Sequence, residues 1–175
     1  MSTAAQLDAL RTGIIDVAIG GGHIAPTDDP IIASVALVDD PLEIALVSAA
    51  GPLASRAWIK ATELRDVPFA FIARRFAPRM YDQVIQTLVD LGLVPSVTLT
   101  GVGPRPLWRI AADSGGWTLG TRSLRTAAPP GLVGVPIEGL SIPWGVRLMW
   151  RRETSAHAVQ QVLELFRRNR LADTA

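Results

Sequence analysis

The sequence predicts an α/β protein built on a mostly parallel sheet, or on two such sheets. Runs of β-type residues alternate with segments of helical periodicity along most of the chain. Several of the β-type runs are continuously apolar, as strands covered on both faces should be. The chain has 175 residues, of which 49% are hydrophobic and 19% charged, so it can bury a core as one domain or as two small lobes.

The elements follow from local patterns. A short helix is expected over residues 4–12, because Thr3 and Gln6 have capping-box spacing and Gly13 follows the last apolar residue of the helical pattern. Bounded β-type runs then predict the strands. These runs are residues 14–20, 31–38, 42–48, 69–73, 97–100, 117–121, 132–137 and 145–150.

Three further helices are predicted between and after these strands. Pro78 suits the first position of a helix that Gly92 ends, and a shorter helix is expected over residues 105–113. Thr154 precedes the last helix, whose final turn is basic. The arginines there favour the negative end of the helix dipole, which gives them a purely structural explanation.

Charge and composition exclude several classes of protein. The net charge is +1, Lys60 is the only lysine, and the arginines are scattered rather than gathered in a stripe. The isolated chain is therefore not expected to bind duplex DNA sequence-specifically. The sequence has no cysteine, which excludes disulfides, thiolate metal sites and cysteine nucleophiles. Neither a signal-peptide pattern nor an apolar run of about 20 residues is found, so we expect a cytoplasmic protein without a membrane partner.

The motifs argue against catalysis, a metal and a cofactor. Ser-x-x-Lys, Gly-x-Ser-x-Gly and His-Glu-x-x-His patterns do not occur. His23 with Asp28 and Asp29 would be a metal site on a single loop, which we do not expect. The sequence GVGPRP (101–106) resembles a dinucleotide loop, but Pro106 stands where close helix–strand packing needs glycine. A helix N-terminus at that loop could still hold an anion.

A set of ordered segments indicates a family. Recognisable patterns are L-x-x-G-x-x-D-x-A-I at 10–19, P-L-A at 52–54 and L-x-x-x-G-x-x-P-x-V at 88–97. The segments that carry the likeness are LRTGIIDVAIG, DDPLEIALVSAAGPLAS, ELRDVPFAFIARRFAPRMYDQVIQTLVDLGLVPSV, IAADSGGWTLGTRSL and GVRLMWRRETSAHAVQQVLELFR. In this order and spacing, through nearly the whole chain, they resemble the effector-binding domain of LysR-type transcriptional regulators.

The resemblance implies a periplasmic-binding-protein-like fold of type 2, with two α/β lobes, two crossover segments and a central cleft. Lobe one is expected at 1–66 and 140–175, and lobe two at 67–139. Family members carry an N-terminal winged helix-turn-helix and a first strand–helix–strand unit in lobe one, and the sequence shows neither. DNA binding is thus expected only through a helix-turn-helix absent from this chain, and the resemblance implies a homo-oligomer, at least a dimer.

The glycine run "GGGH" raises the question of a ligand pocket. In doubly wound lobes, ligands sit beyond the carboxyl ends of parallel strands, where this run is expected. Gly20, Gly21 and Gly22 would let a backbone approach a ligand and adopt unusual φ, and His23 could donate to a carboxylate. The alternative is a simple turn with a solvated histidine.

The facing lobe would supply the other ligand contacts. Arg74 or Arg75, in FIARRF, could grip a carboxylate through two hydrogen bonds, and Thr100 and Val102 lie in TLTGVG. The resemblance thus implies effector sensing within a transcription regulator, and the candidate residues favour a small organic carboxylate that shifts lobe closure or oligomer packing. Alternatives are an enzyme on the same two-lobed fold and a stand-alone solute-binding protein.

Overall fold

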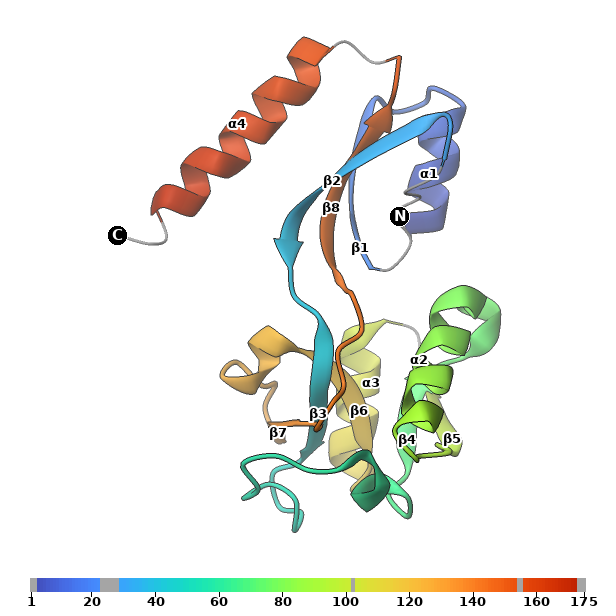
Figure 1. Cartoon of the computed structure of the whole chain (residues 1–175), viewed down its shortest axis with the longest axis vertical. Helices are drawn as coiled ribbons and strands as arrows, with labels where there is room; N and C mark the ends of the chain where they lie inside the picture. Colours follow the sequence, from blue (N-terminus) through green and yellow to red (C-terminus); the bar gives the residue numbers. More distant parts are fainter. Residues whose placement is uncertain (1–2, 23–28, 102, 154–155, 173–175) are drawn as a thin grey trace. The chain divides into compact units, whose positions relative to one another are not determined.

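The computed structural model describes residues 3–22, 29–101, 103–153 and 156–172. The chain divides into two compact units (Figure 1), which we describe separately. Unit 1 comprises Met1–Asp39 and Trp144–Ala175, and unit 2 comprises Asp40–Pro143. The boundaries predicted from the sequence lie at 66/67 and 139/140. The difference arises because the strand over residues 42–48 pairs with strands of unit 2.

Unit 1 contains a three-stranded antiparallel sheet with a helix on each face. The strands lie in the order β1-β8-β2, so the last strand of the chain separates the first two. Their bounds are Val17–Gly21 for β1, Ile32–Asp39 for β2 and Gly145–Arg151 for β8. The helices are α1, at Thr3–Arg11, and α4, at Ala156–Ala172.

The two faces of this sheet have separate apolar clusters. On one face, Leu7 and Leu10 of α1 pack on Ala18 and Met149. On the other, Val159 of α4 packs with residues of β2 and β8. Adjacent strand residues point to opposite faces, which explains why neighbours such as Met149 and the preceding leucine belong to different clusters.

An ion pair joins α1 to the start of β2. The Arg11 guanidinium donates to Asp29 at 2.8 Å, and the same carboxylate accepts the backbone N–H groups of Ile31 at 2.8 Å and Ile32 at 3.1 Å. The Asp29 side chain is only 9% exposed. The hydrogen bond from Arg11 and those from the backbone lower the pKa of Asp29 below its ordinary value.

We expect Asp29→Asn to lower the free energy of unfolding at pH 7 by about 1.5–3 kcal/mol, because charge-assisted hydrogen bonds are lost. A carboxyl with a lowered folded-state pKa stabilises above its unfolded-state value, about 3.9, and loses that contribution as pH falls through the folded-state value. The difference between wild type and variant should therefore shrink on acidification. Urea unfolding followed by far-UV circular dichroism at pH 7 and pH 3 measures it.

Asp8→Asn is the control, because Asp8 bonds the same Arg11 at 3.1 Å but is 77% exposed. Its expected cost is about 0–0.5 kcal/mol. Equal losses from the two substitutions, or a difference between them that does not change with pH, would contradict the role assigned to Asp29.

Unit 2 contains a five-stranded mixed sheet in the order β5-β4-β6-β3-β7. Only the pairs β4–β5 and β4–β6 are parallel, whereas β3 runs antiparallel to both β6 and β7. The strands are β3 (Leu42–Ser48), β4 (Phe69–Ile72), β5 (Val97–Gly101), β6 (Trp117–Thr121) and β7 (Leu132–Pro136). The helices are α2 (Pro78–Asp90) and α3 (Pro104–Ser114), with short 3-10 turns η1 (Ala61–Leu64), η2 (Arg74–Phe76) and η3 (Arg122–Arg125).

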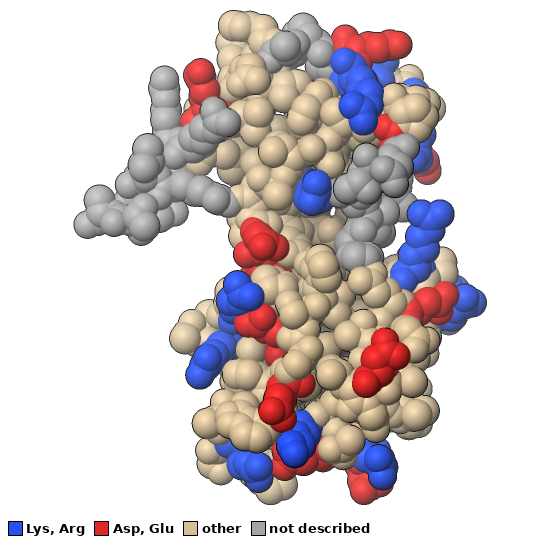
Figure 2. All heavy atoms as spheres, viewed as in Figure 1, with Lys and Arg blue, Asp and Glu red and all other residues tan. Residues whose placement is uncertain are grey.

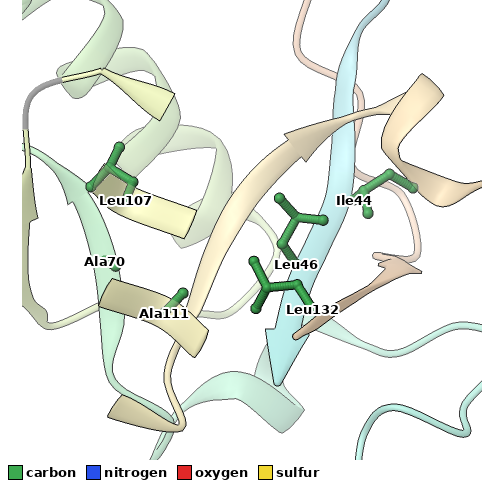
Figure 3. Packing of buried hydrophobic residues seen from close by; sticks show 6 residues of the cluster. All are labelled: Ile44, Leu46, Ala70, Leu107, Ala111 and Leu132. Carbon is green, nitrogen blue, oxygen red and sulfur yellow. The ribbon is translucent and has the colours of Figure 1, made fainter. Parts of the chain in front are cut away.

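Helix α3 covers one face of the unit 2 sheet. Figure 3 shows Leu107 and Ala111 of α3 packed with Ala70 of β4, Leu46 of β3 and other buried residues of the same cluster. On the opposite face, Phe69 stacks on Phe71 at 5.1 Å and on Trp117 at 4.2 Å between ring centroids. The Phe71 ring also lies 5.9 Å from that of Tyr81, on α2.

The predicted elements are largely confirmed, but the mostly parallel sheets are not. The predicted strands 42–48 and 117–121 have the observed bounds, and the first strand begins at Val17 rather than at 14. The parallel prediction was wrong because continuous apolar runs report burial on both faces, which antiparallel strands also have when helices cover both sides.

Candidate functional site

Two parallel strands of unit 2 place three predicted site residues at or just beyond their carboxyl ends. Strands β4 and β5 end side by side, with Ile72 paired to Gly101. Arg74 and Arg75 follow the end of β4 in η2, and Thr100 is exposed near the end of β5. Ligands of open α/β sheets bind beyond the carboxyl ends of the strands, so this edge is the candidate site. Val102, also predicted here, lies outside the described residues.

Arg74 is held by a carboxylate of the following helix. Its Nε and Nη2 donate to the two carboxylate oxygens of Asp82 at 2.6 and 2.7 Å. These hydrogen bonds raise the pKa of Arg74 and lower that of Asp82. The pair ties η2 to α2, and it leaves Arg74 less able than an unpaired arginine to bind a ligand.

Arg75 has no such partner. Its guanidinium carbon lies 4.6 Å from the centroid of the Phe76 ring, a cation–π arrangement that requires no hydrogen bond from the N–H groups. No carboxylate among the residues that the structure describes forms an ion pair with it. Arg75 is therefore the better candidate of the two predicted arginines for an anionic ligand.

Helix α3 begins beside Thr100 and has few N–H donors in its first turn. Gly103, with φ of +84°, precedes the helix, and no side chain caps it. Pro104 and Pro106 lack N–H groups, so Arg105 carries the one backbone donor among the first three helical residues. An anion at this edge would consequently depend on side chains more than on the helix N-terminus.

Two polar contacts at the end of β6 were not predicted from the sequence. Asp40 accepts hydrogen bonds from the Ser123 hydroxyl at 2.6 Å and the Ser123 N–H at 2.9 Å. The Arg122 guanidinium donates hydrogen bonds of 2.8 and 3.1 Å to the two carboxylate oxygens of Glu43. Burial acts to raise the pKa of Asp40, but hydrogen bonds from Ser123 and Thr121 and the charge of Arg122 lower it overall. The partners lie 79 and 83 positions apart, so no local signal marks them.

In unit 1, the glycine run is part of a strand rather than a turn. Gly20 and Gly21 belong to β1 and pair with Arg147 and Val146 of β8. A Cβ at Gly20 would lie 2.8 Å from the Met149 methyl carbon and 3.0 Å from a methyl carbon of α1. Gly20 thus allows the close approach of the protein's own side chains, and it lies in a strand, as predicted, rather than in the simple turn that was the alternative interpretation of the run.

Gly22 is the residue of the run with an unusual φ, +116°. A Cβ there would lie 3.1 Å from the Trp144 ring, and the Gly22 N–H donates to the Gly145 carbonyl at 2.8 Å. The predicted ligand contacts of Gly20, Gly21 and Gly22 remain predictions. His23, the fourth residue of the run, lies outside the described residues.

A cavity of about 170 Å³ lies at the other end of the unit 2 strands, away from the carboxyl end of β4 that Arg75 follows. Its lining includes Val47, Leu53, Val67 and Glu63. The Glu63 carboxylate already accepts the Lys60 N–H at 2.9 Å and pairs with an arginine. An apolar pocket whose one charged group is acidic does not suit a carboxylate ligand.

The charged side chains do not form a large single-sign patch on the face seen in Figure 2, where basic and acidic groups alternate over each unit. Among the described residues, no three His, Asp or Glu side chains are grouped as metal ligands. Within the same ranges, no helix combines the length and the apolar character that a membrane crossing requires.

Comparison with known proteins identifies relatives of the same fold. The effector-binding domain of a BenM variant superposes with a TM-score of 0.76 at 23% identity, covering 99% of this chain and 80% of that one. The BenM effector-binding domain with its effector benzoate gives 0.72 at 22%, covering 99% and 78%. HinK, a LysR family regulator from Pseudomonas aeruginosa, gives 0.77 at 16%, covering 96% of this chain and 58% of its own.

The sequence comparison is more specific than the structural one. No curated protein matches the chain in sequence. The family described as the LysR substrate binding domain, however, matches residues 1–170. This match runs from α1 into α4, through the elements of both units, and agrees with the periplasmic-binding-protein-like type 2 fold of the solved relatives. The chain therefore belongs to the LysR substrate-binding domain family.

Proposed function

We propose that this chain is the effector-sensing domain of a LysR-type transcription regulator and that its effector is a small organic carboxylate. The observation that supports the ligand class is that Arg75 follows the carboxyl end of β4 and that Thr100 lies near the carboxyl end of β5, the strand paired with β4. A guanidinium donates to a carboxylate through two parallel hydrogen bonds, and a hydroxyl adds a third donor. BenM, a relative in fold, has benzoate as its effector, which supports the same class here.

The proposed role is regulation rather than catalysis. The effector would shift an equilibrium between conformations or assemblies by binding one of them more tightly. The solved structure of CbnR, another relative in fold, is a complex of the full-length regulator with its target DNA. By analogy, a DNA-binding segment outside this chain would report effector binding.

The proposal includes assembly of at least two copies. Strands β1 and β2 each pair only with β8 in the described part of unit 1, so each has an outer edge with unused backbone groups. Ile14, Ile19 and Ile31, in or beside these strands, are 78%, 43% and 47% exposed. Open strand edges with apolar side chains favour association.

Titration calorimetry with a panel of aromatic and aliphatic acids, starting with benzoate, tests the ligand class. We expect an acid to bind and its uncharged amide, benzamide in the case of benzoate, not to bind. Arg75→Ala should weaken acid binding about tenfold to a hundredfold, since a charge-assisted contact is lost. Arg74→Ala should weaken it less, because Asp82 already holds that guanidinium.

Arg109→Ala is the matched control, because Arg109 is 85% exposed on α3 and pairs with Asp113 at 3.5 Å. It should leave the affinity unchanged. A chain that binds only uncharged ligands, or an acid whose affinity is the same for wild type and Arg75→Ala, would overturn the proposed site.

A further inference from the structure

Strand β8 contains a partly buried arginine that pairs with no carboxylate of the residues that the structure describes. Arg147 pairs with Gly20 of β1 and with Ala36 of β2. Directly opposed residues of antiparallel strands share a face, so Arg147 lies on the α1 face of the unit 1 sheet. Its Nη2 and Nε approach the Ser34 hydroxyl oxygen at 3.3 and 3.4 Å, which is long for N–H···O hydrogen bonds. No ion pair links Arg147 to any carboxylate in the described ranges.

Two other arginines of unit 1 each lie near a carboxylate. Arg11 donates to Asp29 at 2.8 Å, and Arg151 lies 3.6 Å from Asp16. A guanidinium remains charged in proteins, and removing a charge from water without a counter-charge is unfavourable. Arg147 is partly buried, and among the described residues its one hydrogen-bond partner is the weakly bonded Ser34 hydroxyl. A bound anion would supply the negative charge that the described surroundings of Arg147 do not provide.

Ser34 completes a pair of donors. Its oxygen accepts from Arg147, and its own O–H donates to no described residue. A hydroxyl that accepts from a guanidinium can still donate, so both groups can donate to one carboxylate. Ala36, the β2 partner of Arg147, has a short side chain, whereas the space over Gly20, the β1 partner, holds the Met149 methyl group and the Gln6 amide oxygen.

A buried amide oxygen on the same face also has no hydrogen-bond partner among the described residues. The Gln6 Oε1 atom of α1 has no hydrogen bond in the described part of the protein. It lies 3.2 Å from the position that a Cβ of Gly20 would occupy, above the register partner of Arg147. Rotation of the amide by 180° would present its NH₂ group instead, a further donor for an anion.

We propose that Arg147 and Ser34 form a carboxylate-binding site within unit 1, distinct from the Arg75 edge of unit 2. The ligand is a small organic acid whose carboxylate receives the guanidinium N–H groups and the Ser34 hydroxyl hydrogen. The inference shares the ligand class of the proposed function, but it rests on residues of unit 1 alone and needs no contribution from Arg75.

The test uses the whole chain, labelled with ¹⁵N, and acetate as the probe at constant ionic strength. We expect saturable NMR shifts of the Arg147 Nε–H and of the Gly20 and Ala36 amides. Acetamide, which has the same shape without the charge, should not cause them. Arg147→Ala should raise the Kd of acetate, measured from the shifts of the two amides, at least tenfold. Ser34→Ala should raise it about three- to tenfold.

Two further variants keep the test decisive. Arg147→Lys retains the positive charge if Arg147→Ala does not fold, and the loss of the planar fork should still weaken acetate binding severalfold. Arg75→Ala should leave the unit 1 shifts unchanged, which separates this site from the one in unit 2. Wild-type shifts that do not saturate, or shifts that survive Arg147→Ala or Arg147→Lys in full, would overturn the inference without touching the proposed function.

Discussion

Replacing Trp117 by alanine is expected to lower the free energy of unfolding by about 3–5 kcal/mol. The Trp117 side chain is fully buried in β6, and its ring stacks on Phe69 at a centroid distance of 4.2 Å. Alanine would remove this stacking and leave a large cavity between the unit 2 sheet and its covering elements. Urea unfolding followed by far-UV circular dichroism measures the loss without depending on tryptophan fluorescence.

Trp117→Phe should cost much less than Trp117→Ala. The indole Nε1 of Trp117 is buried and has no hydrogen-bond partner among the described residues. An unpaired buried N–H is unfavourable, so phenylalanine removes a cost along with part of the packing. Trp58→Ala is the control, because Trp58 is 49% exposed. Similar losses for Trp58→Ala and Trp117→Ala would contradict the assignment of Trp117 to the core.

The second large effect is expected from Gly145→Ala, with a loss of about 3 kcal/mol or more. A Cβ at Gly145 would overlap the carbonyl oxygen of Val38 and crowd the Cα of Asp39. Both are backbone atoms of β2, just after the register shift between Ala36 and Val38, and cannot turn aside as a flexible side chain can. The two strands would have to separate, which breaks hydrogen bonds of the unit 1 sheet.

Gly21→Ala provides the matched control in the same sheet. Gly21 lies in β1, and its added Cβ would have the Gly145 carbonyl oxygen, 3.9 Å away, as its nearest neighbour. The expected change is within about 0.5 kcal/mol, as for a surface substitution without special contacts. Chemical unfolding of both variants checks the pair, and an equal stability of Gly145→Ala and Gly21→Ala would show that β2 tolerates the extra methyl group.

Local patterns predicted the elements well because the residues that specify them are neighbours in sequence. Gly13, which ends α1 at φ +72°, and Pro78, which begins α2, act within one helical turn. Strand pairing depends instead on distant segments. The insertion of β8 between β1 and β2 joins residues more than a hundred positions apart, and periodicity carries no information about such partners.

The same distinction separates the predicted from the missed parts of the candidate site. Arg74, Arg75 and Thr100 could be predicted because they follow apolar strands directly, and strand ends are visible in the sequence. The Asp40–Ser123 contact and the Arg147–Ser34 contact could not, since 83 and 113 positions separate the partners. Their proximity results from the order of strands in each sheet.

The amino-acid sequence by itself determined the alternation of strands and helices and the membership of the LysR substrate-binding domain family, because both depend on the order of short local patterns. Only the tertiary structure decided what the glycines do and which arginines are free for a ligand. Gly20 accommodates Met149 and α1, Asp82 occupies Arg74, and Arg147 is left with Ser34 alone among the described residues. Space and counter-charge around a side chain are set by residues that the fold brings from elsewhere, and a one-dimensional pattern does not contain them.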